Sequence, residues 1–206
     1  EILVTDAVEG RVVDAPLKDA DVCLDLNSDA QCSEDEEVYQ SDELGFYNLP
    51  NVEAIEGVKP QVISIGGIDI VTGKNLENLA LMATVPTDPT KKITITPLST
   101  LLSISDDPDA LVLGLGIDEG ITADELVELD PWLGTESESQ VTDEISTGLG
   151  LSVEELDSVM EKSLTLSVQI ANLIQTADKA IPSTTEGNVQ SVQDRALMVT
   201  ASVVKQ

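Results

Sequence analysis

The sequence predicts an α+β fold in which an N-terminal antiparallel β-sandwich is followed by a helical C-terminal region. About the first hundred residues contain short, Val-rich segments with alternating apolar and polar positions, which is typical of strands with one buried face. After Pro97, apolar residues recur at intervals of three and four, which indicates helices. Strands followed by helices are typical of α+β proteins or of two separate domains. We expect two domains, a sandwich over residues 1–96 and a helical domain over residues 97–206.

The first two strands are predicted at residues 8–14 and 20–26, joined by a turn around Pro16. In the second strand the alternation is complete, with Ala20, Val22, Leu24 and Leu26 on one face. Residues 42–45 are predicted to form a hairpin-like turn, in which Gly45 supplies the special backbone angle. A further strand pair is expected at 61–66 and 68–71, interrupted by two glycines, and a short β-branched strand at 93–96.

Two capping boxes predict helix starts in the second half, because a Thr or Ser precedes a Glu by three residues at 122–125 and at 152–155. A long amphipathic stripe after the second box predicts a helix that ends before Pro182. A last helix is expected over 189–203, and the polar segment 134–142 is expected to be a loop.

The composition excludes several classes of partner. The chain has 206 residues, of which 41% are hydrophobic and 2% aromatic, so an aliphatic core is expected. Its formal charge is −29, which repels phosphate backbones and argues against nucleic acid as a partner. Besides metal binding, the acidity has two other interpretations: it aids solubility in salty surroundings, or it reflects a heavily solvated surface. No run of 18 apolar residues predicts a membrane span.

One segment points to a specific ligand. Oxygen-bearing side chains occupy positions 1, 3, 5, 7 and 12 of the acidic loop 25–36, a spacing that suits Ca²⁺ better than Mg²⁺; they are Asp25, Asn27, Asp29, Gln31 and Glu36. Position 7 normally contributes its backbone carbonyl. Ala30 replaces the Gly that a helical EF-hand needs at position 6, which favours a loop framed by strands. The alternative is a solvated acidic loop that binds nothing specifically.

The two cysteines, Cys23 and Cys32, are nine residues apart, one on a predicted strand and one in the loop that follows it. We expect a disulfide, which would require an oxidising compartment; two buried free thiols are the alternative. Two cysteines in a chain without His would leave a tetrahedral zinc site half-filled.

Residues 9–27 and the later Ser41-Asp42-Glu43-Leu44-Gly45-Phe46-Tyr47 carry a resemblance to a known family. They resemble the calcium-binding prealbumin-like (carboxypeptidase-regulatory-like) module of bacterial secreted and lipid-anchored surface proteins, akin to the B-type repeats of Gram-positive adhesins. The resemblance covers about residues 8–105. It implies that Asp25, Asn27, Asp29 and Glu36 bind Ca²⁺ and that Asp42 joins them.

Enzyme signatures are absent from the sequence. The chain has no His for a catalytic base, and no phosphate-binding loop or nucleophile-elbow motif occurs. We therefore expect a non-enzymatic, calcium-stabilised module with a structural or adhesive role. The alternative is a module that binds carbohydrate, peptide or a partner protein, with Trp132 as a candidate sugar contact. Its expected location is extracellular or the bacterial cell surface, with any lipid anchor or export signal outside this fragment and an unknown extracellular protein or glycan as partner.

Overall fold

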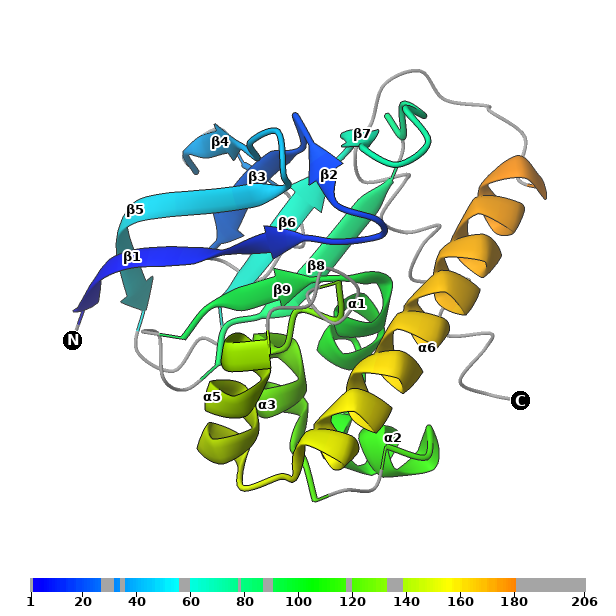
Figure 1. Cartoon of the computed structure of the whole chain (residues 1–206). Coiled ribbons are helices and arrows are strands. Elements are labelled where there is room, and N and C mark those ends of the chain that lie inside the picture. The colour runs from blue at the N-terminus through cyan, green and yellow to red at the C-terminus, as the bar shows by residue number, and fades with distance from the viewer. Residues whose placement is uncertain are drawn as a thin grey trace.

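The computed structural model describes residues 2–26, 32–33, 36–55, 60–77, 79–86, 91–117, 120–132 and 139–180. Its strands lie in the N-terminal part and its helices toward the C-terminus (Figure 1), which confirms the predicted α+β class. None of the helices within these ranges is both long and apolar enough to cross a membrane.

The first sheet has three strands in the order β5-β1-β9. The long strand β1 (Ile2–Val12) pairs antiparallel with β5 (Phe46–Ile55) and parallel with β9 (Ile93–Ile95). The parallel pair departs from the predicted antiparallel sandwich. It arises because, after β5, the chain forms strands of another sheet and only then returns beside β1 as β9. Gly10 permits this pairing, since a Cβ there would lie 1.8 Å from the carbonyl oxygen of Ile93.

The second sheet has four antiparallel strands in the order β4-β3-β6-β8. Its strands are β3 (Asp21–Asp25), β4 (Val38–Gln40), β6 (Gln61–Ile65) and β8 (Ala80–Thr84). A third, two-stranded sheet joins β2 (Leu17–Lys18) to β7 (Ile68–Asp69). In Figure 1, β1 and β5 cross in front of β3 and β6. That the two larger sheets form a sandwich stays a prediction.

The predicted strand pair at 61–66 and 68–71 is wrong, and the strands on either side of the hairpin-like turn at 42–45 do not pair with each other, because each turn passes the chain between sheets. The turn at 42–45 forms as expected, with Gly45 at φ 86° and its N–H bonded to the carbonyl of Asp42. However, β4 before it pairs with β3, whereas β5 after it pairs with β1. Likewise β6 pairs with β3 and β8, whereas β7 pairs with β2.

The described helices are α1 (Pro97–Ser103), α2 (Pro108–Gly114), α3 (Ala123–Glu128), α5 (Ser139–Leu149) and α6 (Val153–Ala180). Both predicted capping boxes are confirmed: the backbone N–H of Thr122 and that of Ser152 each donate to the Glu three residues on. These bonds to the N–H and hydroxyl of Ser152 lower the pKa of Glu155. Residues 139–142, predicted as loop, are helical. The predicted helix 189–203 lies outside the described residues.

Hydroxyl groups of α1 cover one edge of the second sheet. The backbone N–H of Met82 in the edge strand β8 donates to Thr100 Oγ1 at 2.9 Å, and Ser99 Oγ donates to the Met82 carbonyl at 2.8 Å. An exposed strand edge is a template for aggregation, and a helix that satisfies its backbone groups removes that risk. Helix α1 thus satisfies the backbone N–H and carbonyl of the edge strand at Met82.

One hydrophobic cluster joins the two halves. It includes Val8 and Val62 from the two sheets and Leu101 and Leu156 from the helices. Figure 1 shows α6 running diagonally across the helical side of the molecule. The predicted boundary at residue 96 lies between β9 and α1, within this shared core. The two-domain division stays a prediction, and the common core is an argument that the halves stabilise each other.

Candidate functional site

Strand β3 positions the start of the acidic loop. Cys23 is fully buried against Ile63 and Met82, and it forms a disulfide with Cys32, with the Cα atoms 5.8 Å apart. The predicted disulfide is therefore confirmed. Asp25, the last residue of the strand, pairs with Gln61 and is 0% exposed. The bridge fixes the loop to the sheet two residues before its first predicted ligand.

The carboxylate of Glu36 closes the loop from the other side. Its Oε1 accepts from the N–H of Leu26, and its Oε2 accepts from the N–H of Ser33, both at 2.9 Å. Leu26 follows Asp25 directly, so predicted ligand positions 1 and 12 lie at the same end of the loop. A carboxylate has about four acceptor sites, so two N–H bonds leave Glu36 able to accept a further partner.

Asp42 lies elsewhere. In the register of β3 and β4, Asp21 is opposite Gln40, so Asp42 follows the end of the pair that is remote from Asp25. Its Oδ1 accepts from the N–H groups of Leu44 and Phe46, which stabilises the turn into β5. The structure thus gives Asp42 a turn-forming role at the end of the strand pair that is remote from Asp25.

The other predicted ligands, Asn27, Asp29 and Gln31, lie outside the described residues. Within the described ranges, no three His, Cys, Asp or Glu side chains gather in a way that could hold a metal ion. The donor chemistry of Asp25 and Glu36 fits a hard cation such as Ca²⁺, which prefers carboxylate oxygens. The complete ligand set stays a prediction.

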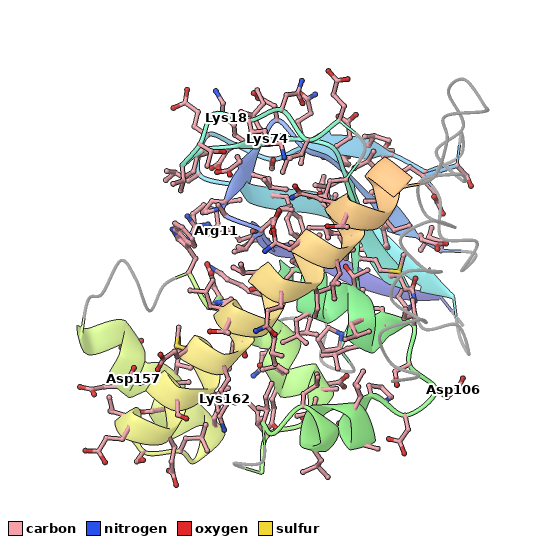
Figure 2. The ribbon with its side chains drawn as sticks, turned by 90° about the vertical axis from the view of Figure 1, so that its right-hand side faces the viewer. Arg11, Lys18, Lys74, Asp106, Asp157 and Lys162 are labelled. Carbon is pink, nitrogen blue, oxygen red and sulfur yellow. A yellow bond between two sulfur atoms is a disulfide. The ribbon has the colours of Figure 1, made fainter. Side chains whose placement is uncertain are left out.

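A second acidic pair consists of Asp14, in the turn between β1 and β2, and Asp69, at the end of β7. Burial is the main cause, and the Asp69 carboxylate the second, of a rise in the pKa of Asp14 from 3.8 to about 6, which Lys74 partly opposes. Asp69 itself accepts from the N–H groups of Val71 and Thr72. Lys74 Nζ donates to Gln175 of α6 at 3.0 Å, and Figure 2 shows Lys74 beside the last turns of that helix.

The raised pKa of Asp14 predicts a pH dependence of stability. The folded protein binds this proton more tightly than the unfolded chain, so the contribution of Asp14 to stability falls as pH rises from about 4 through about 6. Asp14→Asn should therefore raise the melting temperature at pH 7.5 and leave it unchanged near pH 3.5. The gain is at most about 3 kcal/mol at 1.36 kcal/mol per pKa unit, and partial solvent screening reduces it. Melting curves at both pH values test this, with the exposed Asp106→Asn as control. An equal effect of Asp14→Asn at both values would contradict it.

A hollow at the surface between β4 and β5 was not predicted from the sequence. Three of the four aromatic residues of the chain line it, Tyr39, Phe46 and Tyr47. Polar side chains from β1, β4, β5 and the segment before β9 complete it. Trp132, the predicted sugar contact, is not among its lining residues; it is half-buried after α3, where its backbone N–H donates to Asp130 Oδ1. Since sequence places Glu9 and Asn48 far apart, only the β1–β5 register reveals that they are neighbours.

Comparison of the chain with protein-family models, with curated proteins and with solved structures found no match. The geometry and chemistry of its own residues therefore carry the functional argument.

Proposed function

We propose that the chain is a non-enzymatic bacterial module of the cell surface or the secreted fraction, with a structural or adhesive role. The observation that carries this proposal is the Cys23–Cys32 disulfide. Disulfides persist in oxidising compartments and are rare in the cytosol, so this bridge supports an exported protein. An acidic chain of charge −29 also keeps apart from anionic surfaces, which suits a spacer exposed to the medium.

We further propose that Ca²⁺ binds the acidic loop and stiffens it. The support is the approach of Glu36 to the backbone beside Asp25, the bridge that fixes the loop to β3, and the spacing of oxygen-bearing residues between them. Five carboxylates lie between residues 25 and 36, and without a cation they would repel one another. Bound calcium would turn this repulsion into a cross-link between the ends of the loop.

Calcium removal should lower the melting temperature. Extracellular modules bind Ca²⁺ with dissociation constants of about 10⁻⁴–10⁻³ M. About 10 mM CaCl₂ is a tenfold to hundredfold excess over these constants, at which binding adds about 1.4–2.7 kcal/mol. For a chain of this size, that corresponds to a shift of about 3–10 °C. Melting curves by circular dichroism in about 10 mM CaCl₂ and in EDTA measure it.

The matched pair of variants is Asp25→Asn and Asp106→Asn, each of which removes one carboxylate. Asp25→Asn should abolish the difference between the two melting curves, whereas the exposed Asp106→Asn should preserve it. A wild-type melting curve that is the same in CaCl₂ and EDTA would contradict the calcium part of the proposal. It would leave the disulfide argument for export intact.

A ligand-binding module is the second candidate function, and one observation favours it. The hollow beside β4 and β5 gathers aromatic and polar side chains at one open site, as small-molecule sites do. Carbohydrate, peptide and a partner protein are the ligand classes proposed from the sequence.

A further inference from the structure

The hollow has a volume of about 490 Å³. This lies within the range of about 300–1,000 Å³ that is typical of small-molecule sites. Aromatic residues make up 2% of the chain, yet three of the four line this one place. Aromatic rings give a binding site large contact areas and a defined geometry.

Phe46 forms a rigid platform in the hollow. The guanidinium of Arg11 lies over its ring, 4.7 Å from the centroid. Arg11 is itself held by bonds to the carbonyl of Leu44 and to Asp130, so the ring is supported by a fixed group. The side chain remains 38% exposed. A supported ring that remains open to solvent can stack against a flat apolar surface of a ligand without first becoming ordered.

The polar groups beside this ring are arranged in advance. Glu9 and Asn48 are opposite each other in the β1–β5 register, and Asn48 Nδ2 donates to Glu9 Oε1 at 2.8 Å. Both side chains are exposed. The side-chain oxygen Oδ1 of Asn48 and the second carboxylate oxygen of Glu9 remain as acceptors for ligand hydroxyls. Tyr47 is buried and its pKa is raised by that burial, so its hydroxyl stays protonated and donates to the Ile93 carbonyl. Tyr47 thus forms a wall of the hollow, and its hydroxyl proton is already donated to Ile93.

The charges of the hollow disfavour an anionic ligand. An anion would face Glu9 and Asp42 in a chain of charge −29. The same carboxylates attract a cation, but Lys92 also lines the hollow and Arg11 already lies over the Phe46 ring. The exposed ring and the acceptor groups of Asn48 and Glu9 suit a neutral ligand with hydroxyl groups and an apolar face.

We infer that this hollow is a binding site for a neutral saccharide, stacked on Phe46 and hydrogen-bonded to Asn48 and Glu9. The inference rests on the second proposed function, ligand binding, and is independent of the calcium loop. It also assigns the sugar-contact role to Phe46 in place of Trp132.

The test is isothermal titration calorimetry of the full chain with maltohexaose, cellohexaose and chitohexaose as neutral probes. A heparin hexasaccharide and a polylysine peptide serve as the anionic and cationic probes. At least one neutral probe should bind. Phe46→Leu, which keeps an apolar side chain against Arg11, and Asn48→Ala should each weaken that binding about tenfold or more. Leu44→Ala is the matched control, because Leu44 is 55% exposed in the same turn and is not a lining residue.

Binding of no neutral probe would overturn the inference, as would binding of polylysine or heparin in preference to every sugar. Equal affinity of the wild type and Phe46→Leu for a bound sugar would also overturn it. None of these outcomes affects the calcium-dependent melting curve, so failure here is distinguishable from failure of the calcium proposal. Melting curves of the three variants confirm that each is folded before titration.

Discussion

Replacing Arg11 with Met is expected to lower the free energy of unfolding by about 3–5 kcal/mol, because it removes one partner of a buried ion pair. Arg11 in β1 is 2% exposed, and its Nη1 lies 3.1 Å from Asp130 Oδ2, just after α3. The variant keeps an apolar stem of similar length but leaves the Asp130 carboxylate buried without the guanidinium. It also removes the donor to the Leu44 carbonyl and the charge over Phe46. Urea denaturation followed by circular dichroism measures the loss. Figure 2 shows Arg11 on the sheet side of the molecule.

The matched control is Lys91→Met, which removes another cation that bonds to the α3 region. Lys91 Nζ lies 2.8 Å from Glu128 Oε2, but its side chain is 49% exposed. Exposed pairs contribute about 0–1 kcal/mol. A similar small loss for both variants would contradict the view that the Arg11–Asp130 pair ties the strand half to the helical half.

Replacing Cys32 with Ala is expected to cost about 2–4 kcal/mol, the typical contribution of a disulfide. The bridge spans nine residues and joins the acidic loop to the most buried part of β3. Cys32→Ala is preferred to a change at Cys23, since it removes the bridge and leaves the core contacts of Cys23 with Ile63 and Met82. Chemical denaturation of the variant and of the oxidised wild type measures the cost.

The control for this variant is the wild type in reductant, which loses the same bond without a change of sequence. Reduced wild type and Cys32→Ala should unfold at the same denaturant concentration, both below the oxidised wild type. Equal stability of the oxidised wild type and the variant would contradict a stabilising role for the bridge.

The elements that sequence predicted correctly depend on local interactions. The capping boxes at Thr122 and Ser152 each involve bonds between residues three apart, so a four-residue pattern contains them completely. The turn at 42–45 is likewise local. Sequence did not reveal that this turn joins two sheets, because the pairing of Phe46 with Arg11 depends on a strand 35 residues away. The same holds for β9, whose parallel register with β1 depends on the entire path between them.

The candidate sites show the same division. The Cys23–Cys32 pair was predictable because one residue lies on the strand that enters the acidic loop and the other lies in that loop, and the approach of Glu36 to Leu26 closes the same loop. The Asp14–Asp69 pair was missed because Asp14 follows β1 and Asp69 ends β7, and only the small β2–β7 sheet brings them together. The saccharide hollow was missed for a related reason, as its walls come from four separate segments. Asp42 was assigned to the loop from a resemblance, and the β3–β4 register places it at the other end of that strand pair.

Calcium titration of the oxidised chain tests the central claim most directly. Isothermal titration calorimetry of the metal-free wild type should give about one site with a dissociation constant of about 10⁻⁴–10⁻³ M. Asp25→Asn should show no binding, whereas Asp106→Asn should bind as the wild type does. No binding by the wild type, or equal binding by Asp25→Asn, would contradict a calcium site at the Asp25–Glu36 loop.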